Sequence, residues 1–340
     1  MKSKVLIIYT GGTIGMINDT VTGQLRSFDF NLITDHVPEL KRLNVDLTSM
    51  SFENPIDSSN MNPTNWVTIG KLIEENYTKF DGFVILHGSD TMAYTASALS
   101  FMFDGLCKPV IITGSQLPIG TIRTDGKENL ITAIEIAASK DENGEPIVQE
   151  VAIYFEYHLY RGNRSTKYSA SNFEAIKSPN FVELATAGVN IEYHRKLLYR
   201  TTASEFSFQA TFNKRVGLIK LYPGIDFSIY KSVFDRTKVD GIVLETFGAG
   251  NAPKSDVLEE LCTRFIGDGG CILNITQCGS GKVNHGMYET SSLFERIGVI
   301  SGADLTSEAA VTKMMIALGK DSREEVVRII SNSIRGEVTY

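Results

Sequence analysis

Cysteine and histidine are scarce in this chain of 340 residues, which contains four cysteines and five histidines. The cysteines form no C-x-x-C pair, and the histidines form no H-E-x-x-H pattern. Because such spacings are the common signatures of zinc sites, we predict neither a structural nor a catalytic metal. The cysteines are expected to be free thiols, as is usual in reducing compartments.

Long apolar runs and a basic excess are missing as well. No apolar stretch approaches the roughly 20 residues that span a bilayer. The first apolar run ends at Tyr9, which is too short for the core of a signal peptide, and no cleavage site follows it. The 33 basic residues are outnumbered by 40 acidic ones, which argues against a nucleic-acid-binding face. We therefore predict a cytoplasmic protein that binds neither a membrane nor a nucleic acid.

Two glycine-containing loops follow apolar runs directly. The first loop, Thr10–Gly15, follows Val5–Tyr9, and the second loop, His87–Thr91, follows Phe83–Leu86. A short apolar run is typical of a buried strand, and ligands bind at the carboxyl ends of strands in open parallel sheets. Glycines allow a ligand to approach the backbone and leave N–H groups free for an anion. Both loops are therefore candidates for a functional site.

Strand-like runs alternate with helical patterns along the chain, which predicts an α/β fold with a parallel sheet covered on both faces by helices. The hydrophobic content of 42% is ample for a large core. The predicted strands are Lys4–Tyr9, Phe83–His87, Val110–Thr113, Val151–Phe155, Val216–Leu221, Gly241–Leu244 and Cys271–Ile275.

Helix starts are indicated by capping residues. Asn62 followed by proline is a typical N-terminus. Asp125 with Glu128, and Ser322 with Glu325, have the spacing of capping boxes before apolar residues at helical intervals.

A chain of this length suggests two domains. The polar stretch 194–214 separates two series of strands and helices. We predict a larger N-terminal catalytic α/β domain at 1–193, a linker at 194–214 and a smaller C-terminal α/β domain at 215–340.

Thr13 in the first loop is a candidate nucleophile, although a hydroxyl needs a group that removes its proton. The alternative of a phosphate-binding loop is weak, because the first loop matches neither G-x-G-x-x-G nor a Walker motif. The second loop offers Ser89 and Asp90. From the residues alone, an N-cap role for either one on the following helix is equally plausible, and His87 is interpreted as structural.

Both loops resemble the two hallmark motifs of the asparaginase/glutaminase family. The resemblance extends to Gly82–Leu86, Asp57–Ser59, Tyr160–Lys167 and Thr276–Lys282, so it covers nearly the whole chain. It is strongest with the intracellular, type I branch of the family.

The resemblance implies hydrolysis of L-asparagine to L-aspartate and ammonia through an acyl-enzyme, without a cofactor. Thr13 would be the nucleophile, and Ser89 and Lys167 would relay protons. Asp90 would hold the α-ammonium group of the substrate. Backbone N–H groups of the glycine-containing loops would stabilise the oxyanion. The family also implies a homodimer or homotetramer with the site beside a subunit interface.

The resemblance implies a set of substrate-binding residues as well. Asp57 and Ser58 would bind the α-carboxylate and α-ammonium groups, although a plain turn is the simpler interpretation of these two residues. Gly12, Gly88, Ser89 and Asp90 would contribute from the two loops. Ser115, which with Gln116 follows the strand at Val110–Thr113, would line the pocket.

The chain departs from the family pattern at three places. Ser89 stands where the family has threonine, so the hydroxyl is kept and the methyl group is lost. The polar segment 17–28 resembles a lid, but Gln24 occupies the place of the lid tyrosine. Thr276 and Cys278 resemble a region that binds asparagine as an effector in some type I relatives, while Glu245 stands where a basic residue is expected. Effector control therefore stays open.

Two other functions are considered. An ammonia-releasing amidase subunit of a tRNA-dependent amidotransferase uses a similar domain, but it carries a further domain before the first motif, which here begins at Thr10. A non-catalytic amino-acid sensor is the alternative from a different class.

Overall fold

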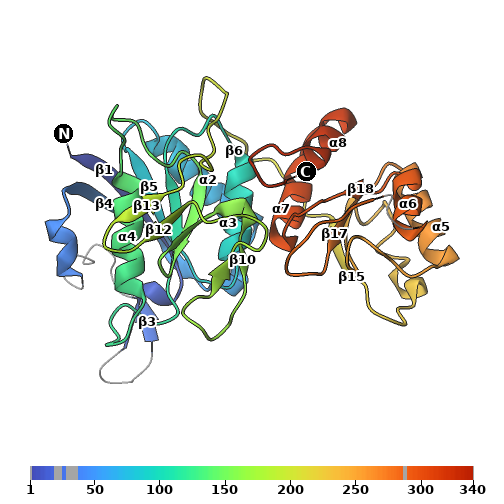
Figure 1. Ribbon diagram of the computed structural model, residues 1–340, viewed down its shortest axis with the longest axis horizontal. Coiled ribbons are helices and arrows are strands. Elements are labelled where there is room, and N and C mark those ends of the chain that lie inside the picture. Colours follow the sequence, from blue (N-terminus) through green and yellow to red (C-terminus); the bar gives the residue numbers. More distant parts are fainter. Residues whose placement is uncertain (1, 19–24, 28–36, 286–288, 340) are drawn as a thin grey trace. The chain divides into compact units, whose positions relative to one another are not determined.

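The computed structural model describes residues 2–18, 25–27, 37–285 and 289–339. The chain forms two compact units, Met1–Ala210 and Thr211–Tyr340, whose border falls inside the stretch 194–214 (Figure 1). Within the described ranges, every helix is too short or too polar to cross a membrane.

The N-terminal unit is built on an eight-stranded sheet in which five neighbouring strands are parallel and three strands at one edge are antiparallel. In spatial order, the parallel strands are β4 (Val45–Ile56), β1 (Ser3–Gly11), β5 (Gly82–Leu86), β7 (Val110–Thr113) and β8 (Val151–Phe155). The antiparallel strands are β9 (His158–Arg161), β12 (Ala185–Ala187) and β13 (Ile191–Tyr193). The predicted parallel sheet is thus confirmed and is extended by an antiparallel edge.

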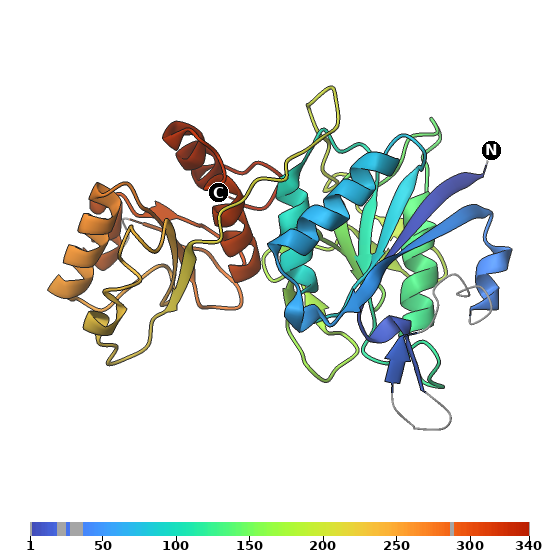
Figure 2. The same cartoon turned by 180° about the vertical axis from the view of Figure 1, so that it is seen from behind.

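Helices cover both faces of this sheet, as Figures 1 and 2 show. Successive residues of β1 point to opposite faces. Leu6 and Ile8 pack with helices α2 (Pro63–Asn76) and α3 (Met92–Met102), whereas Val5 and Ile7 pack with helix α4 (Gly126–Ala138). Both faces of the strand are therefore buried, and this explains its unbroken apolar sequence.

At two of the three predicted helix starts, the predicted side chain caps the helix. Asn62 caps α2 by accepting a hydrogen bond from the Thr64 N–H at 3.0 Å, and the side chain of Asn65 completes a capping box. Ser322 caps helix α8 (Arg323–Ser331) by accepting from the Glu325 N–H at 3.3 Å. Both of these predicted N-termini are confirmed.

The predicted capping box at the start of α4 is wrong. Asp125 occupies the N-cap position, but its side chain makes no cap hydrogen bond. Its carboxylate accepts from the Gln116 and Leu117 N–H groups, at 2.8 and 3.1 Å. Glu128 accepts from the Tyr154 hydroxyl at 2.5 Å. These tertiary contacts take the place of the local cap.

The C-terminal unit contains a four-stranded parallel sheet. Its strands are β15 (Val216–Lys220), β16 (Gly241–Thr246), β17 (Cys271–Thr276) and β18 (Ile300–Ser301). Helices α5 (Asp256–Gly267) and α6 (Glu289–Ile297) lie on one side, and α7 (Ser307–Ala317) and α8 lie on the other (Figures 1 and 2). The smaller α/β domain predicted here is confirmed, and all seven predicted strands are present.

Short elements complete the structure. The 3₁₀ helices are Thr13–Gly15, Pro38–Arg42, Ser58–Asn60, Gly162–Arg164 and Phe227–Tyr230. The short paired strands are β2 (Met16–Asn18) with β3 (Leu25–Ser27), β6 (Phe103–Asp104) with β14 (Ser207–Phe208), and β10 (Thr166–Lys167) with β11 (Ile176–Lys177).

Candidate active site

Four loops meet at the carboxyl edge of the N-terminal parallel sheet. Thr13 follows β1, Asp57 and Ser58 follow β4, Ser89 follows β5, and Gln116 follows β7. The chain places β4 on one side of β1 and β5 on the other, so these loops flank a point where the strand order reverses. Such switch points are the usual ligand sites of open α/β sheets.

Glycines allow three of these loops to touch. A Cβ atom on Gly12, which has φ 88°, would lie 2.5 Å from the Gly88 nitrogen. A Cβ atom on Gly88 would lie 2.5 Å from Ser58 Oγ. Gly11, with φ 133°, packs against the backbone of Ile56, where the pairing of β1 with β4 shifts register. Side chains at the glycine positions would therefore push the loops apart.

Thr13 begins a single 3₁₀ turn directly after Gly12. Thr13 is half-buried, whereas the next two residues, Ile14 and Gly15, are buried. The threonine thus lies on a turn whose next two residues are buried, and it keeps the exposure that a nucleophile requires.

A lysine joins both polar residues of the second loop. Lys167 Nζ donates to Ser89 Oγ at 3.0 Å and forms an ion pair with the Asp90 carboxylate. The Lys167 side chain is 19% exposed and that of Asp90 is 60% exposed. Strand β10 presents this lysine through its antiparallel pairing with β11. Three of the four predicted catalytic residues are therefore in direct contact.

The capping alternative for Ser89 and Asp90 does not hold. Helix α3 begins at Met92, and Thr91 is its N-cap residue, without a side-chain cap hydrogen bond. The Thr91 hydroxyl donates instead to the Ser58 carbonyl at 2.7 Å, which ties the loop after β5 to the loop after β4.

The remaining predicted binding residues lie on the same edge. Asp57 is exposed and caps the turn Ser58–Asn60, because its Oδ1 accepts from the Ser59 N–H at 3.0 Å. Ser58 is 4% exposed. Ser115 is buried, and its hydroxyl donates to the Leu117 carbonyl at 2.5 Å. Asp57 therefore also fills the turn role that its sequence suggested.

His87 supports the second loop from within the core. Its Nδ1 lies 2.7 Å from the Gly88 carbonyl, and its Nε2 lies 2.8 Å from Thr95 Oγ1. Thr95 Oγ1 in turn accepts from Trp66 Nε1 at 3.1 Å. Complete burial lowers the pKa of His87 to about 4, although the Gly88 carbonyl opposes the shift. The ring is therefore neutral and carries its proton on Nδ1, which agrees with a structural role.

Asp125 is a supporting residue of the site that sequence reasoning missed. Its carboxylate holds the two backbone N–H groups that follow Ser115. Burial raises the pKa of Asp125, although these two hydrogen bonds oppose the shift. Gln116 and Asp125 lie nine positions apart in the sequence, so no local pattern could have distinguished this contact from a helix cap.

An acidic cavity of about 230 Å³ lies beside Asp125, and Glu128, Glu156 and Tyr157 also line it. Burial raises the pKa of Glu156 to about 7, and the nearby carboxylates of Asp125, Glu128 and Glu174 add to the shift. The cavity contains none of the predicted site residues.

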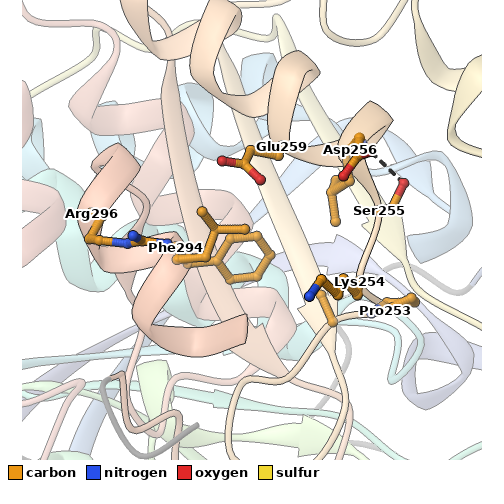
Figure 3. Close-up of a pocket in the computed structure, with 10 residues that line it drawn as sticks. Pro253, Lys254, Ser255, Asp256, Glu259, Phe294 and Arg296 are labelled. Atoms are coloured by element: carbon orange, nitrogen blue, oxygen red, sulfur yellow. Dashed lines mark hydrogen bonds between the residues drawn. The ribbon is translucent and has the colours of Figure 1, made fainter. Parts of the chain in front are cut away.

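A smaller cavity, of about 90 Å³, lies in the C-terminal unit between the start of α5 and helix α6 (Figure 3). Its one hydroxyl, that of Ser255, caps α5 by accepting from the Leu258 N–H. Phe294 supplies an apolar wall. We interpret this cavity as a space left between two packed helices. None of the predicted site residues lines it.

The predicted lid lies partly outside the described residues. The lid segment 17–28 is described only at 17–18 and 25–27, where β2 pairs with β3, and Gln24 lies outside the described residues. Among the residues that are described, no group of three or more His, Cys, Asp or Glu is arranged to hold a metal ion.

Comparisons with known proteins match both units. The family model for the asparaginase N-terminal domain matches residues 4–199, and that for the glutaminase/asparaginase C-terminal domain matches residues 215–330. L-asparaginase 1 of Escherichia coli K12 is 39% identical over an alignment of 344 positions that covers 99% of this chain and 98% of that protein. The 60 kDa lysophospholipase of Mus musculus is 37% identical over an alignment of 367 positions that covers 99% of this chain and 63% of that protein.

A solved structure agrees with these matches. L-asparaginase I from Vibrio cholerae has a TM-score of 0.90 and 39% sequence identity, and the similarity covers 100% of both chains. The predicted family and the two-domain α/β fold are thereby confirmed: this chain belongs to the asparaginase family.

Proposed function

We propose that this protein is an L-asparagine amidohydrolase that releases L-aspartate and ammonia through a threonine acyl-enzyme. The observation that carries the proposal is the contact of Lys167 with both Ser89 and Asp90, at the sheet edge where the glycine-flanked Thr13 lies. Similarity to L-asparaginase 1 along the whole chain supports the choice of substrate.

In the proposed first half-reaction, Thr13 Oγ attacks the side-chain amide carbon of asparagine. Its proton passes to Ser89 while Ser89 gives its own proton to the neutral amine of Lys167. Backbone N–H groups of the two loops stabilise the oxyanion, which is typically worth ~10²–10³ in rate for each donor. The carbon–nitrogen bond then breaks, and the relay returns the proton to the departing ammonia. In the second half-reaction, water attacks the ester and the same relay removes its proton.

Asp90 links substrate binding to this relay. Without substrate, its carboxylate forms an ion pair with Lys167. When the α-ammonium group of asparagine binds Asp90, two cations share one carboxylate and repel each other. The repulsion favours the neutral form of Lys167, which can accept a proton. Together with Asp90, Asp57 and Ser58 bind the end of the amino acid that carries the α-carboxylate and α-ammonium groups, and Gly12, Gly88 and Ser115 line the pocket.

Ammonia release tests this proposal. Purified protein mixed with asparagine is expected to release ammonia and aspartate in equal amounts. Mass spectrometry of protein quenched during turnover should find an acyl group on the peptide that contains Thr13. The control is Thr68→Ala, because Thr68 is an exposed helix residue whose hydroxyl donates to the Thr64 carbonyl of the same helix. Binding of asparagine without ammonia release would instead identify a sensor, and an adduct on Ser89 would reverse the two roles.

The proposed assembly is a homodimer or homotetramer with the site beside a subunit interface. Light scattering coupled to size-exclusion chromatography tests it by mass. A monomer that retains full activity would contradict an interface role for the site.

A further inference from the structure

Gln116 connects the Ser89 hydroxyl to the hairpin that carries Lys167. Its Oε1 accepts from Ser89 Oγ at 3.1 Å, and its Nε2 donates to the Asn172 carbonyl at 3.0 Å. Asn172 lies between β10 and β11, the strands of that hairpin. The side-chain amide of Gln116 therefore connects the loop after β5 with the β10–β11 hairpin that carries Lys167.

These contacts determine the direction of the Ser89 hydroxyl. A carbonyl can only accept, so the NH₂ group of Gln116 must face Asn172 and its oxygen must face Ser89. That oxygen can only accept, so the single proton of Ser89 points toward Gln116. The Lys167 ammonium only donates, and it occupies one lone pair of Ser89 Oγ. One lone pair remains, and it can receive a proton.

We propose that Gln116 is a positioning residue that holds Ser89 Oγ beside Lys167 while the lysine is an ammonium; once the lysine is neutral, the Ser89 proton turns from Gln116 to the lysine amine and the relay starts. This inference rests on the proposed function. Serine lacks the β-methyl group that restricts χ1 in threonine, so its hydroxyl is free to rotate unless hydrogen bonds hold it. Gln116 supplies one of those hydrogen bonds, and Lys167 supplies the other described one.

Gln116 is itself well held. Its backbone N–H donates to Asp125 Oδ2 at 2.8 Å, and the next N–H donates to Oδ1 of the same carboxylate at 3.1 Å. Asn129 Nδ2 donates to the Gly114 carbonyl at 3.0 Å. The Gln116 side chain therefore extends from a backbone that is anchored on both sides, which a positioning residue requires.

A double-mutant cycle tests the inference. Gln116→Met keeps the length of the side chain and removes both hydrogen bonds. We expect kcat to fall about threefold to tenfold with KM nearly unchanged, which is the usual effect of losing one orienting contact. In the Ser89→Thr background the methyl group provides the restraint, so the same change should lower kcat less than about twofold. Gln149→Met is the matched control, because Gln149 is also half-buried and its Nε2 bonds to the Pro146 carbonyl at 3.3 Å.

A second variant keeps the test valid if Gln116→Met is unstable. Gln116→Glu retains an acceptor for Ser89 and adds a negative charge near Lys167, which stabilises the ammonium form. We expect its kcat to exceed that of Gln116→Met and its pH–rate profile to move to higher pH. Equal losses from Gln116→Met in both backgrounds, or a Gln116→Glu profile that does not move, would overturn the positioning role. In those cases the wild type still releases ammonia, whereas an inactive wild type would overturn the proposed function itself.

Discussion

The carboxyl edges of the two parallel sheets differ in strand order and in the partners of their polar side chains. The strand order reverses at β1 in the N-terminal sheet, whereas β15, β16, β17 and β18 follow one another in sequence order. In the C-terminal unit, the polar residues at this edge bond mainly to backbone. Thr276 Oγ1 donates to the Gly248 carbonyl at 2.6 Å, and Gln277 Nε2 donates to the Leu221 and Glu245 carbonyls, at 2.6 and 2.7 Å. In the N-terminal unit, the Ser89 hydroxyl bonds only to the side chains of Lys167 and Gln116 among the contacts that the described residues make.

This difference indicates which strand ends can bind a substrate. Polar groups that satisfy the local backbone stabilise the loop and have less capacity left for a ligand. Polar groups that bond to one another through side chains can exchange those partners for a substrate. The two edges therefore differ both in strand order and in the hydrogen-bonding capacity that their side chains keep for a ligand.

The largest expected effect is the loss of activity from a mutation at the N-terminal edge, compared with a mutation at the C-terminal edge. Thr13→Ala should reduce kcat by several orders of magnitude, as loss of a nucleophile does, and should shift the melting temperature by only a few degrees. Thr246→Ala at the other edge removes a buried hydroxyl that donates to Asn274 Oδ1 at 2.7 Å. It should cost about 1–3 kcal/mol of unfolding free energy and leave the activity of the folded protein unchanged. Comparable losses of activity from both changes would break the comparison.

The Ser89 variants come next in magnitude. Ser89→Ala removes a proton-transfer group and should slow turnover at least roughly a hundredfold. Ser89→Thr restores the residue usual in the family and should stay within about tenfold of the wild type. Both variants should melt within a few degrees of the wild type. Retained activity together with a loss of about 1 kcal/mol in Ser89→Ala would point to a structural hydroxyl.

A buried histidine of the N-terminal unit should make stability depend on pH. His87 is fully buried with a folded pKa of about 4, whereas its ordinary value is 6.5. The unfolded chain therefore takes up a proton that the folded chain does not. Its contribution to stability is complete above pH 6.5 and is lost as the pH falls toward 4, by about 3 kcal/mol in total. Chemical denaturation across this range should show a weaker pH dependence in His87→Gln. An unchanged slope would mean that other groups control acid unfolding.

The smallest expected effect is that of chelation. Prolonged treatment with EDTA should leave the rate of ammonia release unchanged, because the proposed relay uses only side chains and backbone. Loss of activity that zinc or magnesium restores would replace the threonine mechanism by a metal-activated water.

Local patterns predicted the buried elements well and the exposed ones poorly. The strands β1, β5, β7 and β8 have continuous apolar sequences because both of their faces are covered. Strand β4 was missed, since it is an edge strand in which half-buried and exposed residues are mixed, and it contains a proline. The antiparallel edge was missed because its strands are short, and its pairing depends on turns with no clear sequence signal.

The candidate site was predictable in parts. Loop glycines after apolar runs indicated Thr13 and Ser89 from the sequence itself. Lys167 lies 78 residues from Ser89, so only the family resemblance could relate the two. The bridging role of Gln116 and the loop anchor at Asp125 depend on tertiary contacts, which neither spacing nor composition encodes.

The hydrogen-bonded chain behind the second loop has a spectroscopic consequence. Trp66 is the only tryptophan of the protein, and three hydrogen bonds connect its indole through Thr95 and His87 to Gly88. Its emission therefore reports on the N-terminal unit alone, while circular dichroism reports on the helices of both units. A difference between the two unfolding curves would measure, without any added label, how independently the two units lose their structure.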